Sequence, residues 1–160
     1  ELASDNKASI SEQDAAPFAL RIGDIVFARS GATVGKTYVY SPQDGRCSHA
    51  GYLIRFHPDS SRMLVSFLGQ VTHSERYLRW VQESQRAQAQ PNINATEYSS
   101  LLLPVPSLAE QEHIVGALAK VDERRKAESL VLIELAKLKA ALTSALLTGD
   151  LRVTPDEHPA

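Results

Sequence analysis

A long stretch without proline near the carboxyl end of the chain limits the possible folds most. It begins at Ser107-Leu108-Ala109-Glu110, which matches the S-x-x-E capping box of helix starts, and it ends at Gly149, a residue typical of the position after a helix. The pattern predicts one helix over residues 107–148, roughly 60 Å long at 1.5 Å per residue. The small domain that the other residues can form cannot cover such a helix, so we expect the helix to need a partner.

An apolar seam at heptad spacing runs along this predicted helix. It passes through ten positions, of which only Arg124 and Glu128 are charged. The eight apolar positions are Ile114, Ala117, Val121, Val131, Leu135, Leu138, Leu142 and Ala145. Such a seam is typical of a coiled coil. Because the sequence predicts no second long helix, we expect a partner helix in another chain or domain; a hairpin onto its own domain is the alternative. Residues 130–147 are apolar over more than one stripe, which indicates contacts on two sides.

The residues before this helix predict a small mixed α/β domain, which makes the expected fold class α+β. Alternating β-forming residues predict strands over 21–30, 36–40 and 50–56. The first two strands would form a hairpin connected by the glycine-containing loop Gly31–Gly35.

A helical period replaces the alternation between residues 61 and 85, which suits one helix or two short helices broken near Gly69 or Thr72. Asn94 can cap a short helix that follows it. The apolar segment 101–105 contains a proline, so it suits a short edge strand or an extended segment. The expected organisation is a flexible lead-in over residues 1–17, the α/β domain over 18–106, the long helix over 107–148 and a loose tail over 149–160.

Charge is distributed unevenly along the chain, although the net charge is only −2. Between Arg21 and Arg86 there are nine basic and five acidic residues, so the predicted domain is mildly basic and both flanks are acidic. A basic domain permits a phosphate-bearing partner such as nucleic acid without requiring one. Cys47 is the only cysteine, which excludes an internal disulfide, and no apolar run approaches the roughly 20 residues that cross a bilayer. We therefore expect a cytoplasmic protein with no membrane partner.

Two patterns that could carry enzyme or metal chemistry are incomplete, and two others are absent. Gly31–Gly35 followed by Lys36-Thr37 resembles a nucleotide-binding P-loop, but three residues separate the glycines instead of four, and a β-type segment follows. Cys47 and His49 could be half of a zinc site, but the other histidines are scattered. The sequence lacks an Asn-Pro-Pro-Tyr-like segment of amino-methyltransferases and the acidic pair with Glu-x-Lys of nucleases. It therefore predicts no catalytic residue, no metal and no cofactor in this chain.

Polar side chains suited to DNA lie in and around three predicted loops, over residues 31–35, 42–49 and 86–94. In the loop Gly31–Gly35, glycines allow a close backbone approach and the flanking donors suit phosphate oxygens. Amide and guanidinium groups after residue 85 suit adenine and guanine edges. The candidate DNA-binding residues are Arg29, Ser30, Thr33, Lys36, Arg46, Ser48, His49, Arg86, Gln88, Gln90, Asn92 and Asn94. The alternatives are an ordinary hairpin loop with solvated charges and a polar loop that ends in a helix cap.

Four segments, in the same order, resemble the specificity subunits of type I restriction–modification systems. Residues 20–37 (LRIGDIVFARSGATVGKT) resemble the GDI…G…GK segment of that family, and residues 90–94 (QPNIN) resemble its Q-x-N-I-S/N segment. Residues 103–115 (LPVPSLAEQEHIV) resemble its lPp-EQ-I helix start, and residues 138–149 resemble its closing LK…LL-TG stretch. The resemblance covers about residues 18 to 153.

This resemblance implies a DNA-binding subunit without catalytic residues. In the family, long helices space the target-recognition domains and dock the methyltransferase, so the DNA target is bipartite. A modification subunit supplies adenine methylation with S-adenosylmethionine, and a restriction subunit supplies translocation and cleavage with ATP and magnesium. The expected partners are double-stranded DNA, these two subunits, and a second recognition domain or a second copy of the chain joined through the long helix.

The chain departs from a typical subunit because it carries one recognition domain and one long helix instead of two of each. We therefore expect either the C-terminal part of a full subunit or a half-subunit that dimerises. The alternative function is a coiled-coil interaction module that makes no direct contact with DNA.

Overall fold

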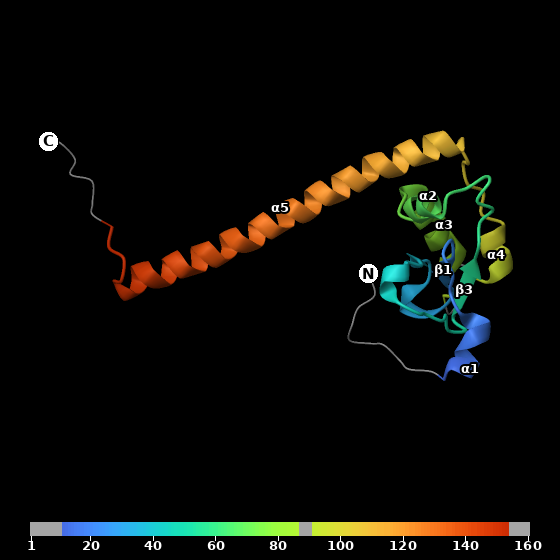
Figure 1. Ribbon diagram of the computed structural model, residues 1–160, viewed down its shortest axis with the longest axis horizontal. Helices are drawn as coiled ribbons and strands as arrows, with labels where there is room; N and C mark the ends of the chain where they lie inside the picture. The colour runs from blue at the N-terminus through green and yellow to red at the C-terminus, as the bar shows by residue number, and fades with distance from the viewer. Residues whose placement is uncertain (1–10, 87–90, 154–160) are drawn as a thin grey trace. The chain divides into compact units, whose positions relative to one another are not determined.

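The computed structural model describes residues 11–86 and 91–153, and for Arg86 it describes the backbone alone. The chain divides into two compact units, Glu1–Val115 and Gly116–Ala160, which are considered separately. The helices and strands in chain order are α1 (Glu12–Ala15), η2 (Ala16–Phe18), β1 (Ile25–Ala28), η3 (Gly31–Thr33), β2 (Thr37–Val39), η4 (Pro42–Asp44), β3 (Leu53–Phe56), α2 (Val65–Val71), α3 (Glu75–Arg86), α4 (Ala95–Ser99) and α5 (Leu108–Thr148) (Figure 1). This content confirms the predicted α+β fold class.

The first unit is built on a three-stranded antiparallel sheet with the strand order β2-β1-β3. β1 and β2 form the predicted hairpin, in which Ile25 lies opposite Val39. On its other edge β1 pairs with β3, and Ala28 lies opposite Leu53. All four residues of β1 are buried, because the strand is central and both faces of the sheet are covered. This burial explains why the sequence of β1 is apolar throughout instead of alternating.

The core lies on the sheet face that carries Ile25 and Phe27, and α2, α3 and α4 contribute to it (Figure 1). The buried cluster comprises Ile25, Phe27, Leu68, Tyr77, Val81, Ile93 and Tyr98. The ring of Phe27 faces those of Phe56, Tyr77 and Tyr98 at centroid distances of 5.3, 6.5 and 4.9 Å. These aromatic contacts join the sheet to both α3 and α4.

The predicted helical region 61–85 forms two helices, α2 and α3, with the break after Thr72. The Thr72 hydroxyl donates to the Gly69 carbonyl (2.7 Å) and lies 2.7 Å from the Thr37 hydroxyl on β2. A Cβ on Gly69 would lie 2.8 Å from a Val39 methyl group, so the glycine lets α2 approach β2 closely. The predicted break is confirmed, and the residues that make it also attach α2 to the sheet.

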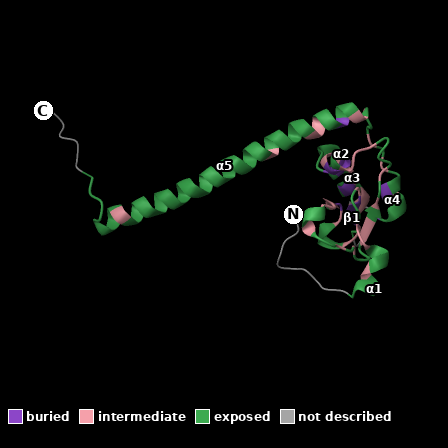
Figure 2. Ribbon diagram, viewed as in Figure 1, coloured by how far each residue is buried: buried purple, intermediate pink, exposed green. Residues whose placement is uncertain are grey.

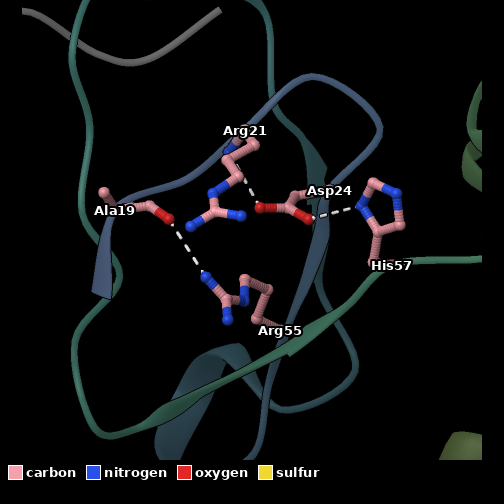
Figure 3. Close-up of polar contacts among 5 residues, drawn as sticks. All are labelled: Ala19, Arg21, Asp24, Arg55 and His57. Atoms are coloured by element: carbon pink, nitrogen blue, oxygen red, sulfur yellow. Dashed lines mark hydrogen bonds and ion pairs between the residues drawn. The ribbon is translucent and has the colours of Figure 1, made fainter. Parts of the chain in front are cut away.

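A polar turn fixes where β1 begins. Asp24 is 3% exposed, and its carboxylate accepts a hydrogen bond from the Arg21 amide (2.8 Å) and lies 2.9 Å from His57 Nδ1 (Figure 3). Gly23 has a φ of 93°, and a Cβ there would lie 2.9 Å from His57 Cε1. The turn conformation therefore favours glycine at position 23, and the Asp24 carboxylate holds the turn through its contacts with Arg21 and His57. The turn also explains why the strand starts at Ile25, later than the predicted residue 21.

Residues 12–18 differ from the expected flexible lead-in, because they form two short helical turns, α1 and η2. Ser11 caps the first turn with its side chain. Just after these turns, the Ala19 carbonyl accepts a hydrogen bond from Arg55 Nη1 on β3 (3.0 Å; Figure 3). Turns this short have no visible periodicity, and they depend on bonds to distant residues. The segment 101–105 forms no strand, so the edge-strand alternative was wrong.

α5 begins and ends where the capping signals predicted. The Glu110 amide donates to the Ser107 hydroxyl (3.3 Å), which is one half of the capping box. Gly149 has a φ of 83°, which suits its position after the helix. Beyond its first turns the helix is exposed along most of its length (Figure 2). No helix within residues 11–86 and 91–153 is long and apolar enough to span a membrane.

The buried side chain of Gln111 fixes the start of α5 within the first unit. Gln111 is 0% exposed, and its amide group makes three hydrogen bonds. Its Oε1 accepts from the Leu64 amide (2.8 Å), and its Nε2 donates to the carbonyls of Arg62 (2.9 Å) and Pro106 (2.8 Å). These bonds tie the segment before α2 to the first turn of α5.

Replacing Gln111 with alanine should destabilise the first unit by about 1–3 kcal/mol for each buried backbone group left unpaired. Urea unfolding followed by the fluorescence of Trp80, the only tryptophan and a residue packed against the core, measures this loss. As a control, Glu112→Ala removes the neighbouring exposed side chain and should change the free energy of unfolding by less than about 0.5 kcal/mol. Equal stability of the two variants would contradict the role assigned to Gln111.

Candidate nucleic-acid interface

The carboxyl end of β1 brings together two of the loops predicted to contact DNA. The Arg29 carbonyl accepts a hydrogen bond from the Ile93 amide (2.8 Å), and Ser30 and Asn92 form an antiparallel bridge. The glycine loop and residues 91–94 therefore lie side by side, although they are far apart in the sequence. The surface formed by residues 29–36 and 92–94 is called the loop edge below.

Two buried tyrosine hydroxyls hold the base of the glycine loop. The Tyr98 hydroxyl donates to the Ala28 carbonyl (2.8 Å) directly before the loop, and the Tyr77 hydroxyl donates to the Gly35 carbonyl (2.7 Å) at its end. Burial raises the pKa of both tyrosines above its ordinary value, so both hydroxyls keep the protons that they donate. The loop thus leaves the sheet from two fixed points, which favours a preorganised binding surface.

Gly31 and Gly35 share a backbone conformation but have different surroundings. Their φ angles are 75° and 83°, in the left-handed region that favours glycine. A Cβ on Gly35 would lie 2.5 Å from a methyl group of Val81 on α3, whereas a Cβ on Gly31 would meet nothing within 4 Å. Gly35 therefore allows α3 to pack against the loop, and Gly31 leaves its backbone open to a ligand.

The two segments of the loop edge contain Arg29 and Lys36 and no acidic residue. Thr33 and Lys36 are exposed, and Arg29, Ser30 and Asn92 are half-buried. Cations, hydroxyls and amides are the groups that hold phosphate oxygens and base edges. The arrangement can therefore bind a polyanion at this end of the sheet.

Asn94 already has a structural role at the start of α4. Its Oδ1 accepts from the Glu97 amide (3.0 Å), and its own amide donates to the Glu97 carboxylate (2.7 Å), which completes a capping box. The alternative of a polar loop that ends in a helix cap is therefore correct at this residue. The Asn92 side chain makes no hydrogen bond to another described residue, so it is the better placed of the two asparagines for a ligand.

The three candidates of the loop 42–49, Arg46, Ser48 and His49, contact the short helical turns instead of the loop edge. Arg46 forms an exposed ion pair with Glu12 (2.7 Å). The Ser48 hydroxyl donates to the Ala15 carbonyl (3.1 Å), and the His49 ring lies edge-on to Phe18. The structure gathers these three residues on a second surface of the first unit.

Three further candidates fall outside what the structure describes. Arg86 is the last residue of α3, and only its backbone is described. Gln88 and Gln90 lie between the two described ranges. All three stay predictions.

The seam positions of the predicted helix interface all lie on α5. Their large apolar side chains outside the first unit are exposed, from 43% at Leu142 to 65% at Val121. Apolar side chains off the seam, such as Leu132 at 66%, are exposed as well. The two charged seam residues, Arg124 and Glu128, form an ion pair with each other (2.6 Å). Exposed apolar residues in such number are typical of an interaction surface.

No group of three or more histidine, cysteine or acidic side chains that could hold a metal occurs in the described part of the chain. The Cys47 thiol, one half of the zinc site considered above, donates to the Asp44 carbonyl (3.6 Å). The Asp44 carboxylate accepts from the Tyr38 hydroxyl, and burial together with this bond raises the pKa of Tyr38 to about 12. These contacts give the residues a structural role in the turn that holds η4.

The chain matches no family model. It is 27% identical over 142 residues to a protein of Methanocaldococcus jannaschii named "Putative type I restriction enzyme MjaX specificity subunit". The match covers 87% of this chain and 33% of that protein, so the chain spans about a third of the length of this relative. This similarity agrees, at a coarse level, with the resemblance carried by the motifs.

The residues that carry the resemblance have structural roles in the first unit. Gly23 and Asp24 form the turn before β1, and Gly35 makes room for α3. Ile93 is 0% exposed, and Gln111 anchors α5. The resemblance therefore supports the scaffold more directly than it supports any base-reading contact.

Gly35→Ala should cost roughly 2–5 kcal/mol, because the new methyl group meets Val81 and the backbone is in the left-handed region. Gly31→Ala is a matched control that adds the same group at a similar φ in open space, so we expect a loss of only about 1 kcal/mol. Urea unfolding followed by Trp80 fluorescence compares the two. Similar losses would show that packing of α3 on the loop is not the reason for a glycine at position 35.

Proposed function

We propose that this chain recognises DNA sequence as the specificity component of a type I restriction–modification complex. The observation that carries the proposal is the bridge between Ser30 and Asn92, which joins the segments with the GK and N-I-N motifs into one surface without acidic residues. The similarity to a protein named as a specificity subunit supports it.

In this proposal different residues of the loop edge contact the DNA backbone and the DNA bases. Arg29, Thr33 and Lys36 hold backbone phosphates, and the open backbone at Gly31 allows a close approach. Asn92 contacts base edges, together with the glutamines of the neighbouring segment. Phosphate contacts set the position of the protein on DNA, and base contacts set its specificity.

The chemistry of the complex belongs to its other subunits in this proposal. A modification subunit binds S-adenosylmethionine and methylates adenine, and a restriction subunit uses ATP and magnesium for translocation and cleavage. This chain is then not an enzyme and holds no cofactor. Its contribution is to place both activities at a chosen DNA site.

We further propose that α5 pairs with a second long helix, which we assign to a second copy of the chain. The seam charges favour an antiparallel pair. Parallel helices in register would bring Arg124 against Arg124 of the second copy, whereas antiparallel helices centred on Lys126 set Arg124 opposite Glu128. The same register sets Val121 opposite Val131. Two readers held at the ends of such a pair would recognise a bipartite target.

The alternative function is a coiled-coil interaction module without DNA contact. The exposed apolar seam of α5 is the observation that favours it, because that seam needs a partner whether or not the first unit binds DNA. The two functions differ in whether the loop edge binds DNA. DNA-binding measurements therefore distinguish them.

Lys36→Ala should weaken binding of a mixed-sequence DNA duplex and reduce the salt slope of log K by about one, because one phosphate contact is lost. Fluorescence anisotropy of a labelled duplex over a range of salt concentrations measures both, with the full chain alone and with a type I modification subunit from the same genome. Arg62→Ala, which removes an exposed cation in the segment after β3, is the control and should leave both quantities unchanged.

A variant that lacks Arg29, Lys36 and Arg86 together tests the assignment of contacts. Normal DNA binding by this variant would mean that the loop edge is not the DNA surface. Failure of the unaltered chain to bind DNA in either setting would instead favour the interaction module.

Glu128→Arg should shift the chain from dimer to monomer, because antiparallel pairing would then set Arg124 against a second guanidinium at two places in the interface. The double variant Arg124→Glu with Glu128→Arg restores opposite charges and should restore the dimer. Sedimentation velocity over a range of protein concentrations measures both states. A double variant that is as monomeric as the single one would contradict the antiparallel register.

A further inference from the structure

Tyr52 is the most exposed of the tyrosine, phenylalanine and tryptophan side chains that the structure describes, at 58%. It lies in the turn that leads into β3. A single exposed aromatic residue needs no explanation by itself. Its neighbours decide whether the exposure has a function.

The backbone places Tyr52 directly beside the loop edge. The Arg29 amide donates to the Tyr52 carbonyl (3.0 Å), which continues the register that sets Ala28 opposite Leu53. Tyr52 comes one residue before the first paired residue of β3, so it is the backbone neighbour of Arg29 at the end of the ladder. The next residue, Ser30, is bridged to Asn92. Tyr52, Arg29, Ser30 and Asn92 therefore form a row of neighbours along the backbone.

The charge around this row suits an anionic ligand. The segments 28–36, 50–53 and 91–94, which meet at the end of β1, contain no acidic residue. Arg29 supplies positive charge beside Tyr52, and Lys36 lies across β1 from Tyr52, directly before β2. Single-stranded nucleic acid combines phosphates with flat base faces, and proteins bind it by placing cations beside exposed aromatic rings.

We propose that Tyr52 is a further DNA-binding residue whose ring stacks on an unpaired base while Arg29 holds the adjacent phosphate and Lys36 a more distant one. This inference rests on the proposed function, and it adds a contact that does not depend on base identity, because every base has a flat face. Tyr52 would thus stabilise a local opening of the duplex at the loop edge instead of reading sequence.

The test compares two DNA probes bound by the full chain: a fully paired duplex, and the same duplex with a short central bubble of unpaired bases. A bubble removes the cost of unstacking, so the unaltered chain should bind it more tightly than the paired duplex. Tyr52→Ala should lose this preference, with bubble binding weakened roughly 5- to 100-fold, the range expected for one lost base stack. Tyr52→Phe keeps the ring and should keep the preference.

Two controls separate stacking from general effects. Lys36→Ala should weaken both probes alike, because it removes a phosphate contact. Leu102→Ala removes another exposed apolar side chain, away from this row in the sequence, and should change neither probe. Anisotropy titrations and thermal melts of each variant give affinity and folding in parallel.

The outcomes distinguish this inference from the function on which it rests. If the unaltered chain binds DNA and Tyr52→Ala keeps the bubble preference, the stacking role of Tyr52 is wrong while the proposed function stands. If the unaltered chain binds neither probe, alone or with a modification subunit, the proposed function itself is wrong. Loss of the preference in Tyr52→Ala and its retention in Tyr52→Phe would support both.

Discussion

The peptide groups of Arg29 hold the parts of the loop edge together. The Arg29 amide donates to the Tyr52 carbonyl, and the Arg29 carbonyl accepts from the Ile93 amide. Each bond contributes only about 0.5–1.5 kcal/mol net, but a buried peptide group left unpaired costs more. The arrangement is therefore fixed mainly by the free-energy cost of leaving these peptide groups unpaired, and less by the net free energy that the hydrogen bonds contribute. Three segments from separate parts of the sequence, which contain Tyr52, Arg29 and Ile93, are consequently joined through the peptide groups of Arg29.

The parts of the fold that the sequence predicted are those with local signals. The bounds of α5 follow from Ser107 and Gly149, which act on their immediate neighbours. The hairpin of β1 and β2 follows from two short runs of β-forming residues around a glycine loop. The cap on α4 follows from Asn94 and the residue three positions later. In each case the interaction that decides the structure lies within a few residues, so the pattern of residue types contains it.

The parts that the sequence did not predict depend on distant pairs. The Gln111 side chain bonds to a backbone amide 47 positions away, and the Tyr77 and Tyr98 hydroxyls bond to carbonyls 42 and 70 positions away. No local pattern separates such a glutamine or tyrosine from an ordinary helix residue. The candidate site shows the same limit, because both halves of the loop edge were chosen for polarity and their contact was not foreseen. Arg46 was also predicted to bind DNA because it is polar, but in the structure it forms an ion pair with Glu12.

The charge of the whole chain says little about its affinity for a polyanion. The net charge of −2 arises because acidic residues predominate near both ends of the sequence, whereas basic residues predominate between Arg21 and Arg86. Screening limits the reach of an exposed charge to about 10 Å at 0.1 M salt, so a bound phosphate responds mainly to the groups that lie next to it. At the loop edge those groups are Arg29 and Lys36, and the segments that meet there contain no carboxylate.

Two cations give modest affinity by themselves, since each phosphate contact adds a similar increment. In the proposed function, affinity for DNA increases when two loop edges are presented to one DNA molecule, because the second binding event then occurs at a high effective concentration. The weak local charge of the first unit and the exposed seam of α5 are therefore complementary in the proposed function. The weak charge makes a second DNA-binding domain necessary, and the seam is the surface through which that domain can be joined.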